Sequence, residues 1–189
     1  MTDEERLRSV TLGEPTRADG EIHLAAYDPG WPREYDRQAD RIHTALGDRV
    51  LLLEHAGSTS VPDLAAKPVI DIVLGVADPA DEGVYVPDLE AAGFSLRIRE
   101  PDWFQHRMFT DGDPAVQVHV FAADSPEIVR MLAFRDRLRT HDDERLLYES
   151  TKRSLAARDW TFVQDYADAK SEVVERIIAR ALADRDAAR

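Results

Sequence analysis

One acidic residue stands in the middle of an apolar segment of the sequence. Residues 69–76, VIDIVLGV, consist mostly of Val, Ile and Leu, which is typical of a strand buried on both faces. The acid is Asp71. An ionised carboxylate in such a strand is costly unless a cation, a metal ion or hydrogen-bond donors lie beside it. Asp71 is therefore the first candidate for a catalytic or metal-binding group.

A Gly-Ser-Thr-Ser turn lies before this strand, after the apolar residues 50–53. Gly57, Ser58 and Thr59 can present backbone N–H groups and hydroxyls to an anion such as phosphate. Taken alone the motif is weak, because Gly and Ser are common in any turn. Lys67 follows the turn and is a candidate for neutralising phosphate, or alternatively a structural partner of Asp71.

Strand alternation places polar residues of two segments on faces that are otherwise apolar. Asp71 shares a face with the residues two positions away, and His119 shares a face with Gln117 in residues 116–121. If these strands are neighbours, the three side chains and the Gly-Ser turn converge on one pocket. Asp71 and His119 are then candidate catalytic residues, and Asp71, His119 and His55 are candidate ligands of a divalent metal ion. The alternative is that both histidines are hydrogen-bonded structural residues, which is the more frequent case for a single histidine.

Three predicted helices carry basic residues on or beside the apolar stripe that faces the core. These residues are Arg135, Arg139, Lys152 and Lys170. Basic groups gathered in this way in an acidic protein predict a local site for phosphate or polyphosphate. The alternative is that the long side chains pack along the core and extend their charged ends into solvent.

The elements that must position these groups form a mixed pattern. Trp31-Pro32 starts a helix that Gly47 ends, and a short helix over residues 86–92 is closed by Gly93. Helical periodicity returns at residue 125 and breaks near residues 141–142 and 158–159, which predicts three helices. Strands are predicted at residues 21–27, 50–53, 69–76, 94–99, 103–110 and 115–121. The predicted class is α+β, with a mixed sheet of five or six strands and a C-terminal helical segment packed on it.

Domain organisation follows from composition along the chain. Residues 1–20 are polar and contain two glycines and a proline, which predicts a mobile N-terminal extension. Residues 21–183 are predicted to form a single domain, with an α/β core over residues 21–121 and a helical subdomain over residues 125–183. A chain of 189 residues is long enough for one full core.

The overall composition excludes several classes of function. A net charge of −13 disfavours binding to bulk nucleic acid. The chain has no cysteine, which removes thiolate metal sites and fits a cytoplasmic protein. No apolar run approaches the length that spans a membrane, so no membrane partner is expected. The signatures of Walker A kinases, dinucleotide dehydrogenases, zinc proteases and G-x-S-x-G hydrolases are absent from the sequence.

A set of motifs spans residues 26–181. It comprises YDPGWPREY from residue 27, EHAGSTSVPDLAAKPVIDI from residue 54, His106-Arg107, VHVF from residue 118, FRDRLR from residue 134, Tyr148 with Lys152, and Tyr166 with Lys170. Together these motifs resemble the GrpB family, which belongs to the nucleotidyltransferase-fold superfamily. One departure is Asp63, where the family usually has glycine.

The resemblance implies a nucleotidyltransferase-like fold and a phosphate-bearing small ligand. In that superfamily a Gly-Ser turn precedes a strand whose paired acids hold divalent metal against nucleotide phosphates. Gly57-Ser58 matches the turn and Asp71 matches the first acid, whereas Val73 occupies the second position. Arg107 joins Lys67 and the helical bases as a candidate phosphate or substrate ligand.

Two functions follow from this resemblance. The first is an enzyme that transfers a nucleotidyl or related phosphoryl group, with Mg²⁺ or another divalent metal. The second is a non-catalytic or accessory module that binds a nucleotide or a CoA-related metabolite and has lost the second metal-binding carboxylate.

Overall fold

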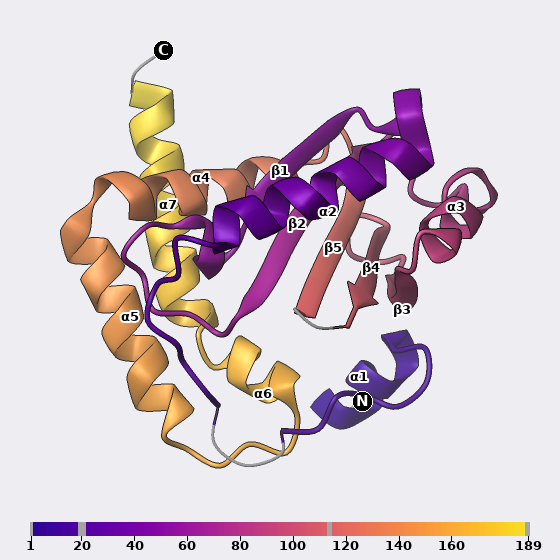
Figure 1. The fold of residues 1–189 in the computed structure, drawn as a ribbon. Coiled ribbons are helices and arrows are strands. Elements are labelled where there is room, and N and C mark those ends of the chain that lie inside the picture. Colours follow the sequence, from indigo (N-terminus) through magenta and orange to yellow (C-terminus); the bar gives the residue numbers. More distant parts are fainter. Residues whose placement is uncertain (1, 19–21, 113–114, 188–189) are drawn as a thin grey trace.

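The computed structural model describes residues 2–18, 22–112 and 115–187, and shows a mixed sheet with helices on both sides (Figure 1). The helices in this part of the chain are α1 (Asp3–Val10), α2 (Trp31–Leu46), α3 (Val86–Ala91), α4 (Pro126–Thr140), α5 (Asp142–Ala156), α6 (Val163–Asp168) and α7 (Ser171–Ala187). The strands are β1 (Leu52–Ala56), β2 (Val69–Val76), β3 (Ser95–Glu100), β4 (His106–Asp111) and β5 (Ala115–Ala122). The predicted α+β class is confirmed.

The sheet has the strand order β1-β2-β5-β4-β3. Strands β2 and β5 pair in parallel at its centre, and the remaining neighbours are antiparallel. β2 is therefore flanked on both edges, which explains why it carries the longest apolar run of the sequence. Residues 69–76 and 115–121 are therefore neighbours, which is the condition under which Asp71, Gln117 and His119 were expected to converge.

Helices α2 and α3 cover one face of the sheet. Ile42 of α2 and Leu89 of α3 pack with Ile70 and Ile72 of β2 in the largest apolar cluster. Pro32 lies in the first turn of α2, and Gly47, with φ +55°, ends it where the sequence predicted.

The C-terminal helices lie on the other side of the sheet. Ile128 of α4 packs on Ala56, Val73 and Phe121. Helices α5 and α7 pack against α4 and against the loop that follows the Gly-Ser turn, through a cluster centred on Leu138, Tyr148 and Ile177. Figure 1 shows α4, α5 and α7 together at the β1 side of the molecule, with α6 below the sheet. This arrangement brings helical residues near the lower end of β2.

Part of the segment predicted as a mobile extension, residues 1–20, has regular structure. Residues 3–10 form α1, because Thr2 and Glu5 make a capping box and Leu7 is buried to 8% exposure. Arg6 then links the sheet to α6, with nitrogen-oxygen distances of 3.6 Å to Glu100 and 3.7 Å to Asp168. Residues 1, 19 and 20 lie outside the described residues.

Several predicted boundaries differ from the structure. Residues 22–27 make only an isolated bridge between Ala25 and Ala66 instead of a strand, and residue 21 is not described. β4 begins at residue 106, because Phe104 and Gln105 adopt left-handed backbone angles that a strand cannot contain. The single helix predicted over residues 162–181 is broken after residue 168, which places Lys170 in the turn between α6 and α7. Helix α7 continues to residue 187, beyond the predicted domain end at 183.

No helix in the described part of the chain combines the length and the apolar character required to cross a bilayer.

Candidate functional site

Asp71 lies on β2, on the face of the sheet opposite α2. It is paired in register with Ala56 on one side and Gln117 on the other, and its side chain is 25% exposed. His119 lies one step further along β5 on the same face, and its Nε2 atom is 3.8 Å from Oδ1 of Asp71. The two predicted catalytic residues are thus neighbours, with a gap between them that is longer than a hydrogen bond.

Gly57 brings the Gly-Ser turn directly against the carboxylate of Asp71. Its φ angle is +63°, and a Cβ atom placed on it would lie 2.0 Å from Oδ2 of Asp71. No other residue type fits both this backbone angle and this distance. The turn is held in place because Ser60 Oγ donates to the carbonyl of Gly57 at 2.6 Å. The glycine is therefore required by the contact with Asp71.

Asp63, the departure from the family pattern, also has a left-handed backbone, with φ +62°. Glycine adopts this angle without strain, and aspartate is among the few other residues that tolerate it. The loop after the Gly-Ser turn thus keeps a backbone shape that suits glycine.

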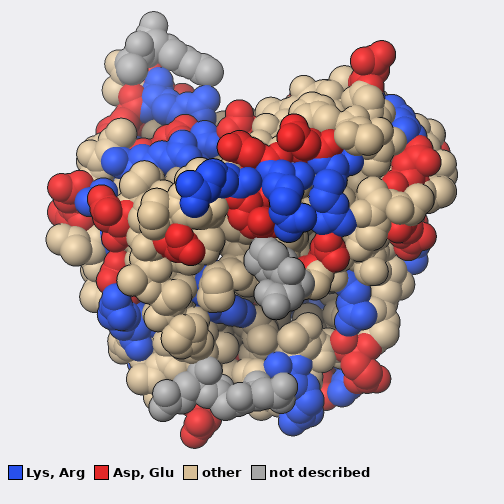
Figure 2. All heavy atoms as spheres, viewed as in Figure 1, with Lys and Arg blue, Asp and Glu red and all other residues tan. Residues whose placement is uncertain are grey.

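All three lysines of the chain gather around Asp71. The sequence contains 21 arginines but only Lys67, Lys152 and Lys170, and each of the three is attracted by the Asp71 carboxylate. No carboxylate in the described part of the chain lies within ion-pairing distance of any of them. Figure 2 shows acidic and basic side chains mixed over one face, with Lys or Arg atoms visible in a hollow in its lower half. The scarcity of lysine relative to arginine in the sequence could have indicated these three residues, whereas helical periodicity could not distinguish them from the arginines.

Burial and mutual repulsion make these lysines weak cations. Burial lowers the pKa of Lys152 to about 7, and repulsion from Lys170 adds to the effect. Burial also lowers the pKa of Lys170 to about 8, against the attraction of Asp71, and repulsion from Lys67 contributes. The pKa of Lys67 is lowered by burial too, again against Asp71. A site with three unpaired cations and one carboxylate favours an added anion.

Lys152 is the most enclosed of the three, with 2% of its surface exposed. Its Nζ atom donates to Oγ of Ser58 at 3.2 Å and to the backbone carbonyl of Ala65. It also lies 4.8 Å from the centre of the Tyr148 ring. Lys170 Nζ is placed in the same way, 4.3 Å from the centre of the Tyr166 ring. Each family motif that pairs a tyrosine with a lysine therefore corresponds to a lysine resting on an aromatic ring.

The predicted arginines are placed differently from the lysines. Arg135 donates to Glu54 at 2.7 Å and to the carbonyl of His55 at 3.0 Å, so it joins α4 to β1. Arg139 donates to the carbonyl of Ser60 at 2.8 Å and 3.0 Å and fixes the turn from outside. These contacts occupy both guanidinium groups with protein oxygens. The phosphate-binding roles of Arg135 and Arg139 stay predictions.

Three further predicted residues either lie on the other face of the sheet from Asp71 or use their polar group in a bond within the protein. Arg107 is on the opposite face of the sheet, where its Nε donates to Glu82 at 2.6 Å. His55 is on that face as well, stacked on Tyr35 with the ring centres 4.8 Å apart. Thr59 donates its hydroxyl to the carbonyl of residue 69 at 2.9 Å. The structure does not bring these side chains to Asp71.

Two residues behind His119 were not predicted. His106 Nε2 lies 3.1 Å from Nδ1 of His119, and His106 Nδ1 lies 2.8 Å from a carboxylate oxygen of Glu100. Burial lowers the pKa of His106 to about 4, against the effect of the hydrogen bond that His106 Nδ1 donates to Glu100. A neutral His106 with its proton on Nδ1 accepts from Nδ1 of His119, which directs His119 Nε2 towards Asp71. The Asp-Gly-Asp segment of the sequence from residue 111 was the available signal, and the pairing of β4 with β5 places both histidines on one face.

The residues present fit a divalent metal ion only in part. Asp71 and His119 would supply one oxygen and one nitrogen, and the described residues contain no cluster of three side chains that could hold a metal. Mg²⁺ requires about six oxygen ligands, several of which are usually water or substrate phosphate. A metal at this site would therefore be held by Asp71 together with oxygens of the ligand.

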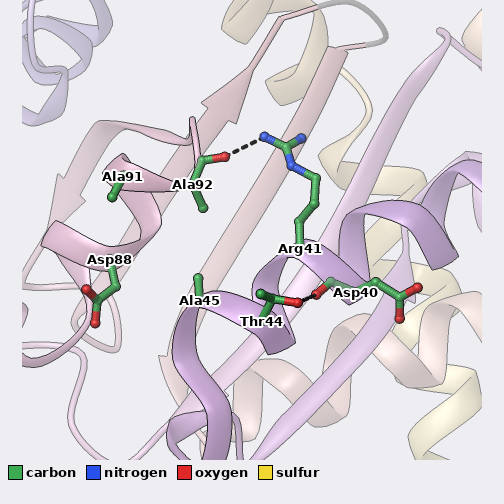
Figure 3. A pocket seen from close by; sticks show the side chains of 7 residues that line it. All are labelled: Asp40, Arg41, Thr44, Ala45, Asp88, Ala91 and Ala92. Atoms are coloured by element: carbon green, nitrogen blue, oxygen red, sulfur yellow. Dashed lines mark hydrogen bonds between the residues drawn. The ribbon is translucent and has the colours of Figure 1, made fainter.

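A separate hollow of about 510 Å³ lies between α2 and α3 (Figure 3). Its arginine, Arg41, is already bound to Asp111 and to the carbonyl of Ala92, each at 2.6 Å. None of the residues predicted from the sequence lines it. The lining residues are Asp40, Arg41, Thr44, Ala45, Asp88, Ala91 and Ala92. We therefore place the candidate site at Asp71.

Replacing Lys170 by methionine should stabilise the protein. Lys170 is held among cations without an ion pair in the described residues, so its removal should raise the free energy of unfolding by about 1 kcal/mol and the Tm by about 2–4 °C. The gain should shrink above about pH 8, where folded Lys170 loses its proton while the unfolded chain keeps it up to about 10.5. Thermal unfolding from pH 6 to 10 measures this, with exposed Arg176→Met as the control. A less stable variant would contradict the assignment of Lys170 as a strained cation.

Comparisons with known proteins agree on one family. Residues 21–180 match the sequence model of the family described as GrpB protein. A UPF0157 protein of Halalkalibacterium halodurans is 54% identical over 180 residues, which cover 95% of this chain and 92% of that protein. A dephospho-CoA kinase of Mycolicibacterium paratuberculosis is 32% identical over 163 residues, 72% of this chain and 40% of that protein.

A solved structure gives the same answer for the fold. The crystal structure of the conserved protein GrpB from Enterococcus faecalis has a TM-score of 0.73 to this chain at 28% identity, covering 86% of this chain and 99% of that one. On the family match, the sequence identity and this structure together, the chain belongs to the GrpB family.

Proposed function

We propose that the protein binds a phosphate-bearing small molecule, with a nucleotide as the expected class, at the Asp71 site, and transfers a nucleotidyl or phosphoryl group there. The observation that supports this proposal is the convergence of all three lysines on one carboxylate. In a chain with a net charge of −13, such a local excess of positive charge attracts an anion that the rest of the surface repels.

The free-energy cost of burying the lysine ammonium groups supports a ligand-binding role for them rather than a purely structural one. Placing an ammonium group in a buried site without a counter-charge is unfavourable, and here it lowers the pKa of Lys152 to about 7. A phosphate group beside Lys152 and Lys170 would restore their ordinary charge. Perturbed pKa values with a specific partner in one place are typical of functional sites.

The nucleotide or CoA-related class is supported by relatives. The dephospho-CoA kinase of Mycolicibacterium paratuberculosis contains a region similar to this chain, which matches 40% of that protein. The name describes that whole protein. For this chain it supports a ligand that combines phosphate with a nucleotide or CoA-like group.

The chemistry of transfer would use Asp71 and His119. Asp71 would orient a phosphate oxygen, together with a divalent metal that neutralises charge on the phosphates when bound. His119 Nε2, directed by the bond of His119 to His106, would accept the proton of an acceptor hydroxyl. The three lysines would stabilise negative charge that develops on the phosphoryl oxygens.

The second candidate is a non-catalytic module that binds the same class of ligand. The specific observation in its favour is Val73, which faces His119 in the sheet where a second carboxylate would be needed for a metal pair. Such a module would bind nucleotide with equal affinity in the presence and absence of Mg²⁺. An enzyme of the first kind would bind more tightly with Mg²⁺.

Asp71→Asn should separate these two candidates. We expect Mg²⁺ to tighten ATP binding to the wild type about tenfold, and we expect the variant to lose this effect while keeping its Mg²⁺-free affinity within about threefold. Any turnover should fall at least about 100-fold. Isothermal titration calorimetry with and without Mg²⁺ measures the binding.

Asp88→Asn is the matched control, because it also removes one negative charge but lies in the hollow between α2 and α3. Its binding should equal that of the wild type. If Asp88→Asn changes ATP binding and Asp71→Asn does not, the ligand binds in that hollow instead of at Asp71. Equal wild-type affinity with and without Mg²⁺ would favour the non-catalytic module.

A further inference from the structure

Ser58 is the one hydroxyl of the Gly-Ser-Thr-Ser turn that contacts a cation. Thr59 and Ser60 donate their hydroxyls to backbone carbonyls at 2.9 Å and 2.6 Å and are 1% and 5% exposed. Ser58 is half-buried, and Nζ of Lys152 lies 3.2 Å from its Oγ atom. Ser58 therefore lies at the site with the amine of Lys152 as its polar partner.

Lys152 is held in the position that a general base would need. The carbonyl of Ala65 and the ring of Tyr148 fix its side chain, and no carboxylate among the described residues pairs with its Nζ. A neutral Lys152 can keep its bond to Ala65 and accept the hydroxyl proton of Ser58. Burial raises the pKa of the Tyr148 phenol, so the ring beside Lys152 stays neutral.

We propose that Ser58 is a nucleophile activated by Lys152, and that group transfer at this site passes through a covalent intermediate on Ser58. The contact meets the usual geometric criterion, because nucleophile and base lie within hydrogen-bond reach and a third group orients the base. Serine with a lysine base is a known variant of nucleophilic catalysis and needs no G-x-S-x-G sequence. The identity of the transferred group as phosphoryl or nucleotidyl rests on the proposed function.

The two half-reactions balance. In the first, Ser58 Oγ forms a bond to phosphorus, the bridging P–O bond of the phosphoanhydride breaks, and the leaving phosphate takes the electron pair. The hydroxyl proton passes to Lys152 Nζ. In the second, an acceptor hydroxyl attacks phosphorus and gives its proton to His119 Nε2, which passes it to solvent. The Oγ–P bond breaks, and Lys152 returns the proton to Ser58. The protein ends unchanged.

A serine nucleophile accounts for a feature that direct transfer leaves unexplained. Direct in-line transfer of the superfamily type relies on paired carboxylates and metal to orient and activate the acceptor. Val73 removes the second carboxylate here. A nucleophile with its own base, positioned by the turn beside Asp71, does not need that pair.

Labelling with an alkyl fluorophosphonate tests the proposal on the full chain. In this reaction Oγ bonds to phosphorus, fluoride leaves, and the proton goes to Lys152. Intact-mass and peptide mass spectrometry should find one adduct on Ser58 and none on Ser58→Ala. The rate should fall about tenfold per pH unit below about pH 7, where Lys152 becomes protonated.

Two variants of neighbouring residues complete the test. Lys152→Arg keeps a cation but removes the base, and its labelling should be at least about 100-fold slower. Arg153→Ala should label at the wild-type rate, because Arg153 is exposed and bonded to Glu149 on the same helix. The pH profile of the wild type gives the result even where Lys152→Arg does not fold.

The outcomes separate this inference from the proposed function. No adduct on the wild type, an adduct on another residue, or a rate independent of pH and of Lys152 would overturn it. ATP binding by calorimetry without labelling would leave the proposed function standing alone. Labelling of Ser58 without ATP binding would keep the nucleophile and reject the phosphate-bearing ligand.

Discussion

Gly57→Ala should lower the affinity for ATP at least about 100-fold and the free energy of unfolding by about 3 kcal/mol. The left-handed backbone costs a residue with a Cβ atom about 1–2 kcal/mol. The new Cβ would also lie 2.0 Å from Oδ2 of Asp71, so the carboxylate must move or the turn must open. Either change separates Asp71 from Ser58. Calorimetric titration and chemical denaturation measure the two effects.

Gly47→Ala is the matched control for the backbone strain. Gly47 has a φ angle of +55° at the end of α2, and no atom lies within 4 Å of a Cβ placed on it. The Gly47→Ala variant should lose about 1–2 kcal/mol in its free energy of unfolding and keep the ligand affinity of the wild type. In the double variant Gly57→Ala with Asp71→Ala, the contacts with Oδ2 and Cγ of residue 71 disappear, whereas the contact with its Cβ at 2.8 Å remains, so only part of the stability should return. If Gly57→Ala binds ATP like the wild type, the close contact between the turn and Asp71 is not part of the site.

Glu144→Ala should be the most destabilising change in the helical segment, at about 3–5 kcal/mol. Glu144 of α5 is 2% exposed, and it accepts hydrogen bonds from Arg137 of α4 and, at 2.8 Å, from Arg180 of α7. One carboxylate thereby joins three helices. Its removal leaves the half-buried guanidinium of Arg137 with Asp184 as its remaining partner. Urea unfolding measures the loss.

The pH dependence of this ion group has a definite sign. Burial opposes ionisation of Glu144, but the hydrogen bonds from Arg137 and Arg180 outweigh it and lower the pKa of the carboxyl. Its contribution is therefore present above the pKa of glutamate in the unfolded chain and is lost as the pH falls through the folded value. The difference between wild type and Glu144→Gln should shrink on acidification.

An exposed ion pair supplies the control for Glu144. Glu175 pairs with Arg130 at 2.6 Å, but its side chain is 60% exposed. Glu175→Ala should cost no more than about 1 kcal/mol, because water and salt screen such pairs. Equal losses for the two glutamates would show that burial does not decide the strength of the ion group.

The stability of the helical segment and the chemistry of the site depend on one another. Lys152 and Lys170 come from α5 and from the turn between α6 and α7, so the packing of these helices sets their distance from Asp71. The lysines are themselves a cost to folding. The Glu144 ion group lies outside the site and offsets part of that cost, which lets the unpaired cations remain where the ligand is expected.

The sequence by itself determined the class of fold, the central strand and the turn beside it. The limits of β2 follow from a mostly apolar run that contains Asp71, and those of α2 follow from Pro32 and Gly47, because each is a local property of the chain. The alternation of β2 and β5 also placed Asp71 and His119 on the same face. The family, its expected ligand class and the missing second carboxylate were likewise readable from the sequence.

The tertiary structure alone decided which partners the basic residues have. The sequence predicted Arg135, Arg139, Lys152 and Lys170 on or beside equivalent helical stripes, and a stripe indicates only that a side chain faces the core. The arginines bind oxygens of residues 54 and 60, about 80 positions away in the chain, whereas Lys152 and Lys170 lie over aromatic rings. Such partners come from elements distant in sequence, and local periodicity carries no information about which element will face a given stripe.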